Sequence, residues 1–217
     1  MTPFSDPAVV ASYAEATPKK VPGLADLHRM AAILMAERAS DNAEILVVGA
    51  GGGLELKAFA EAEPGWRFLG VDPSAGMLDL ARHTLGPLAS RADLRQGYVE
   101  DAPEGPFDGA TCLLTLHFLD RDERLRTLAE IHRRLRPGAA LVVAHHSAAE
   151  GADLTRWLAR SLTFAGTTAN PDAAATMAER LPVLTAEEDE ALLREAGFYE
   201  IALFYAAFSF RGWVAVA

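Results

Sequence analysis

Short apolar runs alternate with stretches of helical spacing along most of this chain. The first run, Ile45–Val48, is wholly apolar and rich in β-branched residues, as a strand buried on both faces of a sheet is. Runs of this kind predict strands over residues 45–48, 68–72, 94–99, 108–114 and 141–144. Helically spaced apolar positions predict helices over 24–39, 54–62, 74–85, 120–135 and 185–197. Such alternation predicts a parallel sheet covered by helices on both faces.

Three of the predicted helices begin at residues that can cap a helix. Ser74 precedes one of them and can accept a hydrogen bond from a free backbone N–H of its first turn. Asp120 with Glu123, and Thr185 with Glu188, have the spacing of capping boxes. These signals support the predicted helix starts independently of the apolar pattern.

The C-terminal part of the chain departs from the alternation. Residues 201–208 and 210–216 have the pattern of two strands with a turn near Ser209–Gly212. A tight turn cannot join parallel strands, so we expect an antiparallel hairpin. The predicted fold class is therefore α/β, a Rossmann-like three-layer sandwich whose seven-stranded sheet is mostly parallel and ends in an antiparallel hairpin. The Ala-rich stretch 151–184 predicts a helical insertion that covers the sheet edge.

The N-terminal segment carries four prolines in its first 25 residues. It predicts an extended arm with at most a short helix around Val9–Glu15. The length of 217 residues suits one domain. We expect a single domain over 1–217, with an N-terminal arm and helix over 1–40 and a helical cover over 151–184.

Composition restricts the partners of the protein. The formal net charge is −10, which disfavours nucleic acid because an acidic surface repels phosphates. One cysteine excludes an intrachain disulfide and a Cys-rich zinc site, and it suits a reducing compartment. The N-terminus lacks a signal-peptide pattern, and the longest apolar runs fall well short of the roughly 18 residues of a membrane span. We therefore predict a cytoplasmic protein with no membrane segment.

A glycine-rich loop, residues 49–53, lies between the first predicted strand and a helix. Glycines permit positive φ angles and a close approach of backbone to ligand, and the helix N-terminus favours negative charge. Asp72 ends the next strand, 19 residues after Gly53, where a carboxylate can accept both hydroxyls of a ribose. The loop alone also fits a plain strand–helix turn, but together with Asp72 it predicts a nucleotide site. Leu54 occupies the third glycine position of the dinucleotide fingerprint, which disfavours NAD.

Five segments in this order resemble the class I S-adenosylmethionine (SAM)-dependent methyltransferases. They are ILVVGAGGG (45–53), VDPSAGML (71–78), GPFDGATCLLTLHFL (105–119), LRPGAALVVA (135–144) and the closing REAGF…FRGWVAVA. Within that family the chain is similar to carboxy-SAM synthases, which share the VPG segment (21–23), the TLHFL segment and the ending. The resemblance implies SAM as cofactor and methyl transfer to an unidentified acceptor, which the acidic charge suggests is a small molecule.

The resemblance also implies positions that contact SAM, namely Gly49, Ala50, Gly51, Gly53, Asp72, Pro73, Met77, Val99, Glu100, Leu113 and Leu114. The glycines would lie along the methionine and ribose parts, and Asp72 would hold the ribose hydroxyls. We add Tyr13 to this set, because the N-terminal arm can act as a lid. Two positions depart from the family. Val47 stands where members often carry an acid, and Tyr98 stands where they often carry Asp.

Three histidines are candidate catalytic bases. Methyl transfer needs in-line geometry, and it needs a base only if the acceptor loses a proton. His145 and His146 follow the fifth predicted strand, and His117 follows the fourth, all at the edge where ligands bind. Packing or capping roles are the alternatives for each. No metal is expected, because no Cys/His/carboxylate spacing supports a site.

Other functions stay open from the sequence. A carboxy-SAM-synthase-like reaction needs a cation for the incoming carboxylate, for which the insertion offers Arg156, Arg160 and Arg180. A non-catalytic SAM-binding protein and a nicotinamide oxidoreductase are further alternatives. The arginines that crowd one helix are interpreted as a solvated face, namely Arg124, Arg126, Arg133, Arg134 and Arg136. The hairpin edge and the arm are candidate contacts for a homodimer.

Overall fold

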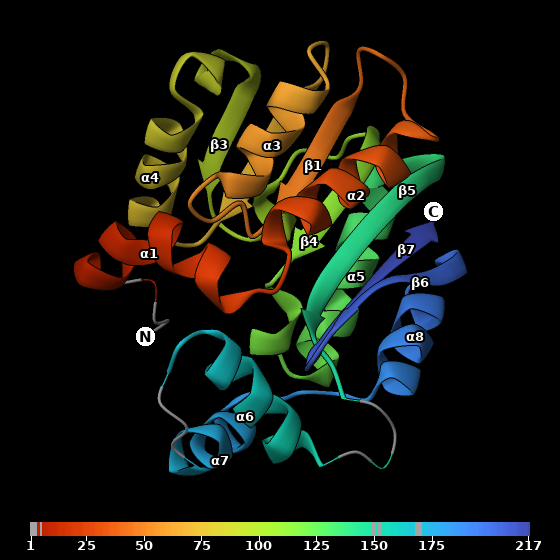
Figure 1. The fold of residues 1–217 in the computed structure, drawn as a ribbon. Coiled ribbons are helices and arrows are strands. Elements are labelled where there is room, and N and C mark those ends of the chain that lie inside the picture. The colour runs from red at the N-terminus through yellow and green to blue at the C-terminus, as the bar shows by residue number, and fades with distance from the viewer. Residues whose placement is uncertain (1–3, 5, 149–150, 152, 168–170) are drawn as a thin grey trace.

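The computed structural model describes residues 4, 6–148, 151, 153–167 and 171–217. Its seven-stranded sheet has the order β3-β2-β1-β4-β5-β7-β6 (Figure 1). The strands are β1 Glu44–Val48, β2 Arg67–Asp72, β3 Ala92–Gln96, β4 Phe107–Leu113, β5 Leu135–His146, β6 Tyr199–Ala207 and β7 Phe210–Val216. Strands β1 to β5 pair in parallel, and β7 pairs antiparallel with both β5 and β6. The predicted mostly parallel sheet with a C-terminal hairpin is confirmed.

Helices cover both faces of this sheet, and each face has its own hydrophobic core. On one face lie α2 Leu24–Ala36, α3 Leu54–Ala62 and α4 Ala75–Leu85. On the other face lie α5 Arg121–Arg134 and α8 Ala186–Glu195, together with the 3-10 helix η3 Val99–Asp101. The 3-10 helices η2 Gly86–Arg91 and η4 Leu116–Phe118 complete the connections.

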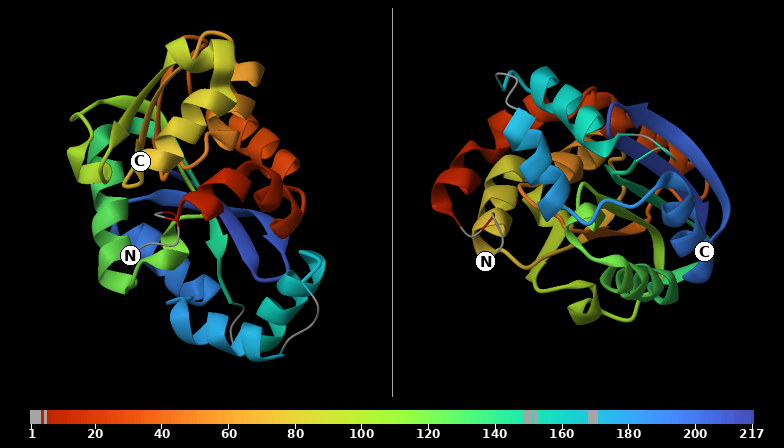
Figure 2. Two further views of the ribbon diagram at one scale, coloured as in Figure 1. Left: turned by 90° about the vertical axis from the view of Figure 1, so that its left-hand side faces the viewer. Right: turned by 90° about the horizontal axis from the view of Figure 1, so that it is seen from below.

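Three helices gather where the parallel strands end. These are α1 Pro7–Lys20, α6 Leu154–Phe164 and α7 Pro171–Arg180, with α6 in contact with both of the others (Figure 1 and Figure 2). The last two fall within the predicted cover over 151–184, of which residues 152 and 168–170 lie outside the described residues. None of the described helices is both long and apolar enough to cross a membrane.

The predicted caps are present at the start of three helices. Ser74 Oγ accepts a hydrogen bond from the Met77 backbone N–H. Asp120 and Glu123 form a reciprocal capping box at α5. Thr185 and Glu188 do the same at α8. These local signals place the helix starts correctly because each satisfies a backbone N–H that has no partner inside the helix.

Several predicted boundaries are wrong. The arm is not extended, because α1 forms a 14-residue helix that Asp6 caps and Pro7 begins. The third strand ends at Gln96, so Val99 lies in η3. Strand β5 continues to His146, so His145 and His146 belong to the strand and do not follow it. The hairpin turn lies at Phe208 and Ser209, where Phe208 takes a φ of 51°.

Candidate functional site

The glycine loop after β1 is fastened to the end of β2. The backbone N–H groups of Gly49 and Ala50 both donate to the Val71 carbonyl, over 2.9 and 3.0 Å. A Cβ at Gly49 would lie 2.1 Å from Thr115 Oγ1, and a Cβ at Gly53 would lie 2.8 Å from the Cα of Ala81. These two glycines are therefore required by packing within the protein as well as by their positive φ angles.

Asp72 joins the loop to the start of α4. Its Oδ2 accepts a hydrogen bond from the Gly51 N–H at 3.0 Å, and its Oδ1 accepts one from the Ser74 N–H at 2.8 Å. Burial raises the pKa of this carboxyl, and the two N–H donors oppose that rise. A carboxylate offers about four lone-pair sites, so each oxygen of Asp72 keeps capacity for a further donor such as a ribose hydroxyl.

Tyr13 reaches the outer side of the loop from α1. A Cβ at Gly51 would lie 3.4 Å from the Tyr13 hydroxyl, and a Cβ at Gly52 would lie 2.7 Å from its ring. Burial, followed by the charge of Glu55, raises the pKa of Tyr13 to about 12, so the phenol stays neutral. The ring of Tyr13 thus packs directly against the loop backbone.

A small cavity remains beside the loop. Its volume is about 10 Å³, and its lining includes Tyr13, His28, Gly53, Glu55 and Leu114. Pockets for ligands of nucleoside size measure about 300–1,000 Å³. With the ring of Tyr13 against the loop, this cavity is much smaller than a nucleoside.

Glu55 is a buried acid of this site that sequence reasoning missed. It lies in the first turn of α3 and is 7% exposed. Its Oε1 accepts a hydrogen bond from Thr111 Oγ1 at 2.7 Å. Burial raises its pKa to about 8, against which the Thr111 hydrogen bond acts. Its spacing in the sequence could have indicated its burial. Glu55 stands four residues before the core residue Phe59, so both lie on the same side of α3.

The other predicted cofactor residues lie along the same end of the sheet. Leu113 ends β4 with its side chain buried, and Leu114 follows it with a φ of 58°. Met77 is buried close to Gly51. Pro73 and Glu100 are exposed. Val99 packs its side chain into the core.

The three candidate bases form a buried cluster. His117, in η4, and His146 lie with ring centroids 4.8 Å apart. Burial, followed by the charge of His145, lowers the pKa of His146 to about 4. Burial, reinforced by the other two histidines, holds the pKa of His117 well below its ordinary value. His117 and His146 are therefore neutral at pH 7.

The hydrogen bonds of the three histidines differ. His146 Nδ1 lies 2.8 Å from the hydroxyl of Ser209, which in turn lies 2.7 Å from that of Ser161 in α6. His145 Nε2 lies 3.1 Å from Asp189 Oδ1. His117 Nδ1 is buried without a hydrogen-bond partner in the described part of the chain.

The interpretation of the arginine-rich helix as a solvated face is wrong at two positions. Arg124 is 0% exposed and pairs with Asp189 at 2.7 Å, and it also donates to the Pro182 carbonyl. Arg134 is buried and donates to the carbonyls of Glu100 and Ala102. Burial opposes ionisation of Asp189, but its charged and hydrogen-bonding neighbours, His145 first, bring its pKa below the ordinary value. This ion pair ties α5 to α8.

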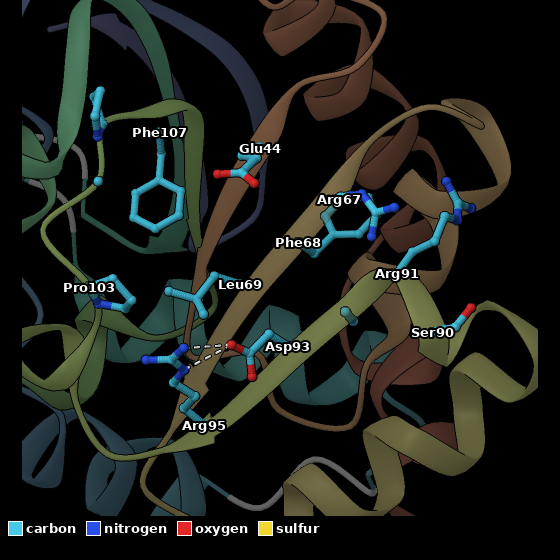
Figure 3. Close-up of a pocket in the computed structure, with 13 residues that line it drawn as sticks. Glu44, Arg67, Phe68, Leu69, Ser90, Arg91, Asp93, Arg95, Pro103 and Phe107 are labelled. Atoms are coloured by element: carbon cyan, nitrogen blue, oxygen red, sulfur yellow. Dashed lines mark hydrogen bonds and ion pairs between the residues drawn. The ribbon is translucent and has the colours of Figure 1, made fainter.

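A larger cavity lies at the opposite end of the sheet. It has a volume of about 530 Å³ and lies at the amino ends of β1, β2 and β3 (Figure 3). The chain between β3 and β4, all of it described, forms η3 and no α-helix, so this part of the sheet face stays open. Arg95 donates to Asp93 within the groove. Ligands of open α/β sheets bind at the carboxyl ends of strands, so this groove is not the predicted nucleotide site.

The described residues hold no group of three or more His, Cys, Asp or Glu placed to bind a metal.

Known proteins share both the sequence pattern and the fold. Residues 45–138 match the family described as "Methyltransferase domain". The matched segment covers 94 of the 217 residues, which is less than half of the chain. The match agrees with the resemblance to class I SAM-dependent methyltransferases drawn from the motifs.

Two curated relatives match almost the whole chain. The carboxy-S-adenosyl-L-methionine synthase of Erwinia tasmaniensis is 25% identical over 97% of this chain and 90% of its own length. That of Klebsiella pneumoniae is 23% identical over the same shares. Both identities are low, so this chain and these synthases are distant relatives.

Solved structures share the fold of this chain. A putative O-methyltransferase of Nostoc punctiforme has a TM-score of 0.73 and 22% identity, over 97% of this chain and 60% of that one. PigF with S-adenosylhomocysteine (SAH) has a TM-score of 0.72 and 20% identity, over 99% of this chain and 61% of that one. The chain thus spans about 60% of the length of these proteins.

Proposed function

We propose that this protein transfers a methyl group from SAM to a small-molecule acceptor. The observation that carries the proposal is Asp72, held between the glycine loop and α4 at the carboxyl edge of the sheet, within a matched methyltransferase domain. Structural neighbours that are named O-methyltransferases support an acceptor of small size. The net charge of −10 argues in the same direction, against a polyanion.

The residues present fit SAM. Asp72 has free lone pairs for the ribose hydroxyls. A Cβ at Gly51 would meet the Tyr13 hydroxyl at 3.4 Å and Met77 Cε at 3.5 Å, both at ordinary contact distance. Met77 and the backbone of Leu113 and Leu114 supply apolar surface and carbonyl groups at the same edge. SAM, when bound, supplies an activated methyl group on its sulfonium sulfur. The chain itself has to bind it, keep water out and orient the acceptor.

His117 is our choice among the three histidines for a base. A base must be neutral and must have a free ring nitrogen, and His117 Nδ1 has no hydrogen-bond partner among the described residues. His146 Nδ1 is engaged with Ser209. His145 Nδ1 is also without a hydrogen-bond partner among the described residues, but His145 Nε2 lies 3.1 Å from the carboxylate of Asp189, which is paired with Arg124. His117 follows β4 by way of Leu114, and the resemblance implies that the backbone of Leu113 and Leu114 lies near the sulfonium of SAM. It would accept a proton from an acceptor hydroxyl.

Calorimetry with SAM and SAH tests this function, with Asp72→Ala as the diagnostic variant. Loss of hydrogen bonds to a charged group should lower the affinity for SAM roughly 10- to 150-fold, equivalent to about 1.5–3 kcal/mol of binding free energy. Asp79→Ala is the matched control, because Asp79 is an exposed acid of α4 that pairs with Arg82. The proposal fails if the folded wild-type protein binds neither ligand at millimolar concentration.

A carboxy-SAM-synthase-like activity is the second candidate, favoured by relatives matched over 90% of their length. The incoming carboxylate would need a cation from the cover helices. Arg160 lies there with its guanidinium 4.2 Å from the ring centroid of Trp157. Mass spectrometry of the nucleotide that copurifies with the protein separates the candidates, since a carboxylated adduct supports the synthase. A cytoplasmic location and a homodimer stay predictions, which fractionation and size-exclusion chromatography would test.

A further inference from the structure

Glu55 is a buried acid with little to stabilise its charge. It is 7% exposed, and its hydrogen bond comes from one neutral hydroxyl, that of Thr111. No basic side chain in the described part of the chain forms an ion pair with it. Burying a carboxylate is unfavourable unless it is paired or kept protonated. A ligand with a positive group would therefore gain from reaching it.

The groups around Glu55 are neutral. Tyr13 faces it from α1 with a raised pKa. Cys112 of β4 lies on the opposite face of the sheet, and burial raises the pKa of its thiol. His28, in α2, lines the same cavity, and burial lowers its pKa to about 4. The small cavity beside the glycine loop therefore contains one acid and no cation among the described residues that line it.

The position of Glu55 also explains one departure from the family pattern. Val47 stands where family members often carry an acid, and Val47 pairs in register with Thr111 of the neighbouring strand. Paired residues of adjacent strands project on the same face of a sheet. Because Glu55 accepts its hydrogen bond from Thr111, the first turn of α3 brings a carboxylate to the place where β1 lacks one.

We propose that Glu55 binds the α-ammonium group of the methionine part of SAM. The proposal rests on SAM binding as proposed above. It adds a residue that the motif comparison does not assign. SAM carries two cationic groups, the ammonium and the sulfonium. Glu55 lies in the cavity bordered by the glycine loop, along which the methionine part is expected.

Calorimetry with two neutral-sulfur ligands separates the ammonium from the rest of the cofactor. SAH keeps the ammonium, whereas 5′-methylthioadenosine lacks the whole amino-acid part. Glu55→Gln should lower the affinity for SAH about 10- to 100-fold and change the affinity for methylthioadenosine by less than about twofold. Glu61→Gln, an exposed acid of the same helix, should change neither affinity.

Proton release gives a readout that does not depend on a variant. With a pKa of about 8, Glu55 is mostly protonated at pH 7, so an arriving ammonium displaces its proton. Binding of SAH to the wild-type protein, measured in two buffers of different ionisation enthalpy, should release about one proton. Methylthioadenosine should release none, and Glu55→Gln should abolish the release.

The outcomes distinguish this inference from the proposed function. If the folded wild-type protein binds neither ligand, SAM binding itself is refuted. If SAH binds without proton release, or if Glu55→Gln weakens both ligands equally, the role of Glu55 is refuted. If Glu55→Gln weakens SAM but leaves SAH unchanged, Glu55 acts on the sulfonium and the proposal is overturned. If the variant does not fold, the wild-type proton measurement decides.

Discussion

Replacing Glu55 with glutamine should remove a large part of the pH dependence of protein stability. The folded-state pKa of Glu55 is about 8, raised by burial above its ordinary value of 4.5. Between those two values the folded protein binds more protons at this site than the unfolded chain does. The free energy of unfolding therefore falls as the pH rises through this range. The contribution of Glu55 is fully present below pH 4.5 and is lost above pH 8.

The magnitude follows from the size of the shift. Each pKa unit corresponds to about 1.4 kcal/mol, so a rise from 4.5 to about 8 amounts to about 5 kcal/mol between the two ends of the range. Glutamine keeps the shape of the side chain and still offers an oxygen to the Thr111 hydroxyl, but it cannot ionise. The variant and the wild-type protein should therefore have similar stability at pH 5. Above pH 8 the variant should be more stable by several kcal/mol.

Denaturant unfolding at pH 5, 6.5, 8 and 9 measures this difference. Trp66 and Trp213 are buried, so their fluorescence reports loss of the core. All other titrating groups are shared by the two proteins and cancel in the comparison. Glu61→Gln should follow the wild-type curve, because Glu61 is exposed. Parallel stability curves for Glu55→Gln and the wild-type protein would refute the buried, protonated state of Glu55.

Two further predictions concern the buried polar groups. Asp189→Ala leaves Arg124 buried without its carboxylate, and should lower the free energy of unfolding by about 3–5 kcal/mol in urea titrations. The exposed neighbour Glu187, changed to Ala, serves as control, and a loss below about 1 kcal/mol for Asp189→Ala would contradict the prediction. Measured with a substrate that has an acceptor hydroxyl, His117→Gln should lower kcat roughly 10²- to 10⁴-fold. The same substitution should leave the affinity for SAH unchanged. His83→Gln, which changes an exposed histidine of α4, should leave kcat unchanged, and a kcat for His117→Gln equal to that of the wild-type protein would assign His117 to packing.

The order of helices and strands could be predicted because the local sequence signals agree with the long-range packing for most elements. The apolar run of β1, the glycine loop and the three caps each identify an element without reference to the rest of the chain. The N-terminal arm could not be predicted in the same way. Its four prolines favour extended chain, and α1 is stabilised by contacts with α4 and α6 that lie far away in sequence. The observed end of β5 also differs from the predicted one, because the length of this strand depends on its pairing with β7.

The residues of the candidate site also fall into two groups, those that local sequence patterns identify and those that depend on partners from other segments. Residues that act through the backbone or through strand position, such as the glycines and Asp72, were accessible to motif reasoning. Glu55 and Arg124 were not, because charged residues are buried only when a specific partner is present, and those partners come from other segments. Their spacing nevertheless carried a signal. Glu55 precedes Phe59 by four residues, and Arg124 precedes Leu128 by four, both on core-facing stripes. A charged residue on such a stripe has to be matched by a buried hydroxyl, an ion pair or a ligand. For Arg124 the partner is Asp189, and for Glu55 it is the hydroxyl of Thr111, to which the proposal above adds the ammonium group of SAM.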